Sequence, residues 1–100
     1  MIKIKIDYNN NFIKSMKISG HANYEEHGKD IICASVSSMV ILSANLALKY
    51  KQDSLKVKQE EGLVDIDILI EDEFVNLIFS NLKDELEELS KDYKKHVKII

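Results

Sequence analysis

The stretch DIICASVSSMVILSANLALKYK, residues 30–51, decides the fold of this chain. Its eighteen uncharged residues, 31–48, lie between Asp30 and Lys49. Such a segment predicts a helix that is apolar on nearly all sides, so we expect a sheet to cover one side and a further surface to cover another. As a helix, 31–48 is about 27 Å long, short of a ~30 Å hydrocarbon layer, and serine and asparagine residues dilute it. We therefore expect no membrane span.

The segments around this helix alternate between apolar and polar residues, which is typical of half-buried strands. The strands predicted in this way are residues 1–8, 12–19, 55–59 and 63–70. The apolar face of the first of them is predicted to be Ile2, Ile4, Ile6 and Tyr8. Three asparagines before residue 12 and a glycine before residue 63 predict two hairpin turns, because both residue types tolerate left-handed backbone.

A second helix is predicted over residues 71–93, where the apolar spacing changes to that of a helix. Its predicted buried stripe is Phe74, Leu77, Ile78, Leu82, Leu86, Leu89 and Tyr93. Residues 96–100 predict a short final strand. We expect a single α+β domain over residues 1–100, with about five strands in a largely antiparallel sheet, two helices on one face and the order ββαββαβ.

Composition excludes several classes of protein. The chain has 14 basic residues, all lysine, against 17 acidic ones, with a net charge of -3, so we expect no direct binding of nucleic acid. The lone Cys33 cannot form an internal disulfide, and the first residues alternate with lysine where a secretory signal has an apolar run. These features predict a cytoplasmic protein.

The segment between Gly20 and Cys33 is the part most suited to chemistry. Asp30 is predicted to be the N-cap of the first helix, which places Cys33 in the first turn, near unpaired backbone N–H groups and the positive end of the helix dipole. A thiolate is stabilised at such a position. Residues 21–29 lack apolar periodicity and predict an exposed, mobile loop, from which His21 can fold back to Cys33 and act as its base.

Other interpretations of these residues remain open. A single cysteine is often a buried filler, and a single loop histidine often only makes a hydrogen bond. Zinc ligands are present among His21, Glu25, Glu26, His27 and Cys33, but their spacing matches no common zinc motif, so we expect no metal and no cofactor. His96 lies among lysines near the end of the chain and is expected to be a solvated surface residue.

The same segment contains a longer motif, which reads Gly20-His21-Ala22 and then Gly28-x-Asp30-Ile31-Ile32-Cys33-Ala34-x-Val36-Ser37. This motif, with its spacing, resembles the signature of the ribosomal-processing cysteine proteases, the Prp family. The resemblance in length and element order covers the whole chain. Ile32 and Ser35 stand where valine and alanine are usual, and neither position belongs to the Cys33–His21 pair.

The resemblance implies a cysteine endopeptidase that removes a short, hydrophobic N-terminal extension from a large-subunit ribosomal protein, and it implies a homodimer. The family's nucleophile corresponds to Cys33 and its histidine to His21. Residues with possible supporting roles are Gly20, Asp30, Ala34 and Ser37, and those of the substrate loop are Ala22, Asn23, Tyr24 and Gly28. Backbone N–H groups near Cys33 and Ala34 are the expected oxyanion donors. Asp30 either caps the helix or orients His21, and the strong local N-cap signal favours the cap.

Two alternative functions remain at this point. One is a non-catalytic module for ribosome assembly or protein interaction, in which Cys33 is a buried filler. The other is a thiol redox sensor, which shares a reactive Cys33 but cleaves no peptide.

Overall fold

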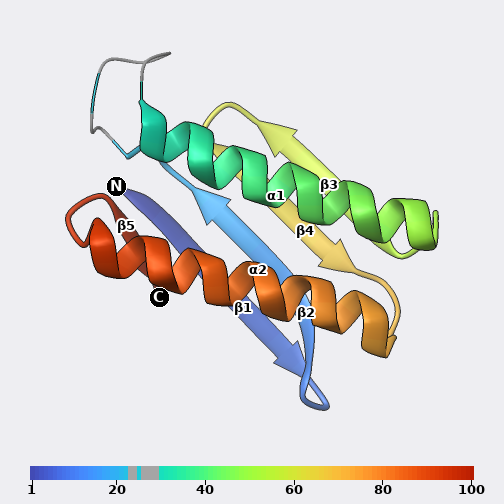
Figure 1. Ribbon diagram of the computed structural model, residues 1–100. Helices are drawn as coiled ribbons and strands as arrows, with labels where there is room; N and C mark the ends of the chain where they lie inside the picture. The colour runs from blue at the N-terminus through green and yellow to red at the C-terminus, as the bar shows by residue number, and fades with distance from the viewer. Residues whose placement is uncertain (23–24, 26–29) are drawn as a thin grey trace.

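The computed structural model describes residues 1–22, 25 and 30–100 of the chain. The elements of this part follow one another in the predicted order ββαββαβ (Figure 1). They are β1 (Ile2–Asn9), β2 (Phe12–Ser19), α1 (Ile31–Tyr50), β3 (Leu55–Glu60), β4 (Leu63–Ile68), α2 (Glu73–Asp92) and β5 (Val97–Ile99).

The strands form one five-stranded sheet in the order β3-β4-β2-β1-β5. Both hairpins, β1–β2 and β3–β4, are antiparallel, and β4 joins them by pairing antiparallel with β2. Strand β5 pairs parallel with β1, because α2 carries the chain back across the sheet before β5 begins. The predicted fold class, an α+β sheet that is largely antiparallel, is therefore confirmed.

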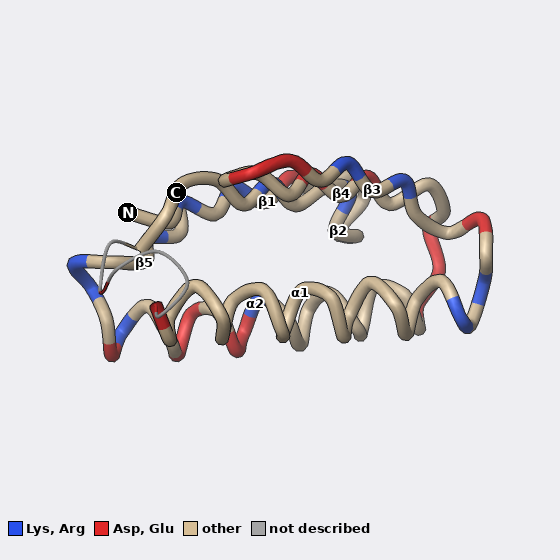
Figure 2. The backbone as a smooth tube through the Cα atoms, turned by 90° about the horizontal axis from the view of Figure 1, so that it is seen from above, with Lys and Arg blue, Asp and Glu red and all other residues tan. Residues whose placement is uncertain are grey.

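Both helices lie on one face of this sheet, as Figure 2 shows in a view from above in which the two layers are seen edge-on. Helix α1 packs beside α2 and against β3, while α2 packs against β2 and β5. The core lies between the two layers and includes the fully buried Ile4, Met16, Ile66 and Phe79. Charged residues lie along the sheet strands, where Lys17 and Asp65 pair across β2 and β4 at 3.9 Å.

The first hairpin turns at Asn10 and Asn11, which have the positive φ values of 53° and 66° that the asparagines predicted. The end of this hairpin extends past α2 in Figure 1. Tyr8 precedes the turn and is 51% exposed, with the Lys83 ammonium 5.6 Å from its ring centroid. The prediction that Tyr8 belongs to the buried face is wrong, because the helix layer covers this end of the strand incompletely.

The buried stripe of α2 also differs from the prediction. Its buried members are Val75, Ile78, Phe79, Leu82 and Leu86. Phe74 and Leu77 were predicted to be buried, yet they are 42% and 62% exposed. Two overlapping apolar stripes exist on this helix, and the sequence cannot distinguish them, because the way the helix packs on the sheet selects which one is buried.

Helix α1 turns five residues toward the core, namely Ile32, Val36, Val40, Ala44 and Ala47. By length and composition alone it is apolar enough to cross a membrane, a test that core helices of soluble proteins also pass. Its outer side carries exposed apolar residues, of which Leu42, 72% exposed, is the most open. The sheet and α2 thus cover two sides of the predicted apolar helix, and its outer side is left without a covering surface in the described part of this single chain.

Candidate active site

Asp30 begins α1 and places Cys33 in its first turn. The Asp30 side chain accepts hydrogen bonds from the backbone N–H groups of Ile32 at 2.9 Å and Cys33 at 3.1 Å. The predicted N-cap role of Asp30 is confirmed. The other carboxylate oxygen, Oδ2, accepts the N–H of Glu25 at 3.5 Å, so the cap also holds a residue of the preceding segment.

A close approach of backbones at Gly20 directs the chain from β2 toward this helix start. Gly20 has a φ of +91°, and a Cβ there would collide with the carbonyl oxygen of Met1. Its N–H donates to the carbonyl of Gly62 at 2.8 Å, which ties the end of β2 to the β3–β4 turn. Glycine is therefore required at position 20, because a side chain would collide with Met1 and would not tolerate this backbone conformation. The next residue, His21, lies between the β3–β4 turn and α1.

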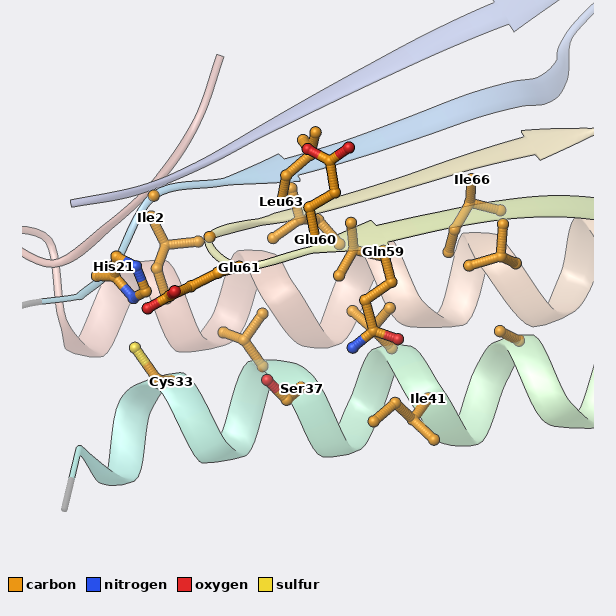
Figure 3. Close-up of a pocket in the computed structure, with 18 of the residues that line it drawn as sticks. Ile2, His21, Cys33, Ser37, Ile41, Gln59, Glu60, Glu61, Leu63 and Ile66 are labelled. Atoms are coloured by element: carbon orange, nitrogen blue, oxygen red, sulfur yellow. The ribbon is translucent and has the colours of Figure 1, made fainter. Parts of the chain in front are cut away.

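The imidazole of His21 lies against Gly62. A Cβ built on Gly62 would be 3.1 Å from His21 Nε2, tighter than an ordinary contact, and Gly62 has a φ of +71°. Figure 3 shows the Cys33 sulfur pointing from α1 toward the His21 ring. The structure thus brings together the two residues predicted as nucleophile and base, from the start of α1 and from the end of β2.

Ala22 contacts the sulfur directly. Its backbone N–H donates to Cys33 Sγ at 3.3 Å. The Ala22 side chain is 1% exposed, so the expectation of an exposed loop is wrong at this residue, whose methyl group anchors the chain in the core. The other predicted substrate-loop residues, Asn23, Tyr24 and Gly28, lie outside the described residues.

The N–H groups predicted as oxyanion donors are already engaged. The Cys33 N–H donates to Asp30 Oδ1, and the Ala34 N–H donates to the Asp30 carbonyl at 3.1 Å as the first bond of the helix. Ala34 itself lies toward α2, in a shallow depression that it shares with Ser35 and Glu85. The side-chain cap and the first backbone bond of the helix thus each occupy one of the two donors that the sequence suggested.

An apolar groove of about 500 Å³ starts at Cys33 and His21 and runs along α1. One wall is α1 and the other is the β3–β4 hairpin, as the labelled side chains in Figure 3 show. The α1 residues that line it include Ser37, Ile41, Ala44 and Leu48. Among the described lining residues the charged ones are Glu60 and Glu61, at the β3–β4 turn. Ser37 is exposed one turn along from Cys33, and the half-buried Cys33 opens into the groove, which argues against a buried filler.

His96 is not the solvated surface residue that its lysine neighbours suggested. It is half-buried, and its Nδ1 lies 2.9 Å from the carbonyl oxygen of Ala22. Neither His96 nor Gly62 was predicted to belong to the site. Position 96 carried no local signal, whereas Gly62 was interpreted only as a turn residue.

No three His, Cys, Asp or Glu side chains gather as metal ligands within the part of the chain that the structure describes. Of the zinc ligands considered from the sequence, His27 and Glu26 lie outside that part.

Comparison with known proteins identifies the family of this chain. The profile of the family described as cysteine protease Prp matches residues 1–98. The chain belongs to this family. A Prp relative from Bacillus subtilis (strain 168), named ribosomal processing cysteine protease Prp, is 42% identical over 36 residues. That match covers 36% of this chain and 32% of the relative, so it spans about a third of the relative's length.

Solved structures with a similar fold match nearly the whole chain. The ribosomal processing protease Prp from S. aureus, in complex with a covalently linked product peptide, is 21% identical and superposes with a TM-score of 0.93 over 99% of this chain and 97% of that one. The protein SMU.848 from Streptococcus mutans is 29% identical, with a TM-score of 0.79 over 99% of this chain and 91% of that one. These likenesses confirm the fold.

Proposed function

We propose that this chain is a cysteine endopeptidase in which Cys33 is the nucleophile and His21 the general base. The observation that carries the proposal is the position of the Cys33 sulfur, which lies at the N-terminus of α1, points toward His21 and opens into an apolar groove. The N-terminus of α1 and the Ala22 N–H both direct positive partial charge toward the sulfur. Membership of the Prp family supports the same assignment.

In this mechanism His21 accepts the thiol proton as the sulfur attacks the scissile carbonyl carbon. The C–N bond then breaks, the leaving amine takes the proton from His21, and a thioester joins the N-terminal part of the substrate to Cys33. His21 next accepts a proton from water, whose oxygen attacks the thioester carbonyl. The Cys33 sulfur leaves and takes this proton back from His21, and the carboxylic acid product is released.

The groove supports an extended, largely apolar peptide as substrate. From Cys33 to Leu48 the α1 wall is about 22 Å long, which matches six or seven residues of extended chain. A short, hydrophobic N-terminal extension of a large-subunit ribosomal protein has this form, and the relative from B. subtilis is named a ribosomal processing protease. We infer that such an extension is the substrate.

A cleavage assay tests this proposal. The purified chain is incubated with a peptide that contains a hydrophobic extension ending in aromatic residues, and mass spectrometry locates the product ends. We expect cleavage that Cys33→Ala and His21→Ala each reduce at least about a thousandfold. An intact peptide, with Cys33 equally slow to alkylate in the parent and in His21→Ala, would support the interaction module instead. A fast-alkylating Cys33 without cleavage would support the redox sensor.

We also infer that the chain acts as a homodimer. The outer side of α1 exposes Ile31, Leu42 and Leu46, the kind of surface that a second copy covers. Sedimentation at micromolar concentration is expected to show twice the 11.5 kDa of one chain, and Leu42→Lys is expected to shift it toward the monomer. An 11.5 kDa species alone, in the parent protein, would contradict the dimer.

A cytoplasmic location completes the proposal. The chain has one cysteine and it is a free thiol, which a reducing compartment maintains. Fractionation of cells that express the tagged chain tests this point, and recovery in the membrane fraction would contradict it.

A further inference from the structure

We propose that His96 is a positioning residue for Cys33, acting through the peptide groups of Ala22. The inference rests on two hydrogen bonds that meet at Ala22. His96 Nδ1 lies 2.9 Å from the Ala22 carbonyl oxygen, and the Ala22 N–H donates to Cys33 Sγ at 3.3 Å. One residue of backbone therefore connects the His96 ring to the sulfur that the proposed function makes the nucleophile.

The direction of the first bond follows from its acceptor. A carbonyl oxygen can only accept, so Nδ1 of His96 carries the hydrogen and donates it. This holds for the neutral ring with its proton on Nδ1 and equally for the doubly protonated ring. His96 therefore holds the Ala22 carbonyl in either state, and its role needs no change of charge.

His96 is itself firmly held. Its backbone N–H donates to the Tyr93 carbonyl at 2.9 Å, and its carbonyl accepts the N–H of Ile2 at 2.8 Å. These bonds tie the backbone that carries the ring to the end of α2 and to the start of β1. The ring is thus presented from a backbone position held on both sides, at the point where the chain leaves β2 toward α1.

Ala22 connects the His96 ring to the Cys33 sulfur. Its methyl group is buried, its carbonyl is held by His96, and its N–H is directed at the sulfur. His21 is the preceding residue, so the same anchor limits the backbone of the proposed base. Loss of the His96 bond frees the Ala22 peptide groups to rotate, which weakens the hydrogen bond from the Ala22 N–H to Cys33 Sγ.

Alkylation of Cys33 by iodoacetamide tests the proposal, and it reports one site because the chain has a single cysteine. In His96→Leu we expect the rate at pH 7 to fall about three- to tenfold, with the pH profile displaced toward higher pH, since one hydrogen bond to the sulfur is weakened. His96→Asn is expected to keep most of the rate, because its amide nitrogen occupies the place of Nδ1. His96→Gln presents its amide nitrogen at the place of Nε2 and should behave like His96→Leu.

Lys95→Ala is the matched control, because Lys95 is an exposed neighbour of His96, and it is expected to leave the rate and the profile unchanged. Urea unfolding of each variant separates a folding defect from a local one. If His96→Leu does not fold, the comparison of His96→Asn with His96→Gln decides the question.

The proposal is overturned if His96→Leu alkylates with the parent rate and pH profile, or if His96→Asn and His96→Gln lose rate equally. The assay uses no peptide, so its outcome is separate from that of the proposed function. An uncleaved peptide with the expected order of alkylation rates would refute the peptidase and leave the positioning role in place.

Discussion

Replacement of Gly62 tests the geometry of the proposed base most directly. A Cβ at this position would be 3.1 Å from His21 Nε2, so the ring has to move by a few tenths of an ångström. The left-handed backbone, with φ of +71°, adds a cost of about 1–2 kcal/mol for an ordinary side chain such as alanine. Because a shift of 1 Å costs about a hundredfold in rate, the smaller displacement is expected to reduce kcat/KM for peptide cleavage about tenfold in Gly62→Ala.

The variant Gly62→Asn separates these two effects. Asparagine tolerates left-handed backbone, so its free energy of unfolding should lie closer to that of the parent, yet it places the same Cβ against His21. We therefore expect Gly62→Ala to lose both stability and activity, and Gly62→Asn to lose activity while it recovers stability. The measurements are kcat/KM on the extension peptide and urea unfolding for each variant.

Parent activity in Gly62→Asn would refute the reasoning, because it would show that the close approach of the imidazole to residue 62 has no consequence for the base. If Gly62→Asn recovers both activity and stability, the whole loss in Gly62→Ala comes from the strained backbone of the turn and none of it from the contact with His21.

Three further predictions concern other parts of the chain. Asp30→Ala is expected to cost about 1 kcal/mol of stability by urea unfolding, whereas Asp30→Asn, which still caps, should cost less. The hydrogen bond from the Val75 backbone N–H holds the pKa of Asp72, the α2 N-cap, below its ordinary value. The ionised Asp72 carboxylate therefore stabilises the fold fully at pH values above the pKa that Asp72 has in the unfolded chain. That stability is lost as the pH falls through the lower folded pKa, and an acid titration of unfolding in which Asp72→Asn shows the same slope as the parent would contradict this. Glu61→Gln should lower kcat/KM about two- to fivefold for peptides with lysine beside the scissile bond, and a neutral matched peptide should show no change.

The start of α1 could be predicted because its determinants are local. Asp30 lies three residues before Cys33, and the capping bonds to Ile32 and Cys33 involve neighbours in the chain. The strands and the second helix followed from periodicity in the same way. The errors at Tyr8, Phe74 and Leu77 concern which apolar residues are covered, a property that depends on where the helices lie over the sheet.

The surroundings of the sulfur could not be predicted in this way. His96 and Gly62 are distant from Cys33 in the sequence, and each reaches the site through the pairing of strands. The pairing of β1 with β5 brings the start of β5 next to β1, and the pairing of β2 with β4 brings the β3–β4 turn to Gly20. No local pattern marks a residue whose partner is chosen by the order of strands.

The amino-acid sequence by itself determined the elements and the cap of the first helix, and it suggested the proposed pair of Cys33 and His21, because periodicity, capping and residue type act over a few neighbouring positions. Only the tertiary structure decided that His21 lies against Gly62, that Ala22 is an anchor and that His96 faces it. These contacts join segments far apart in the chain, and the free energy of packing the whole sheet and its two helices selects them together.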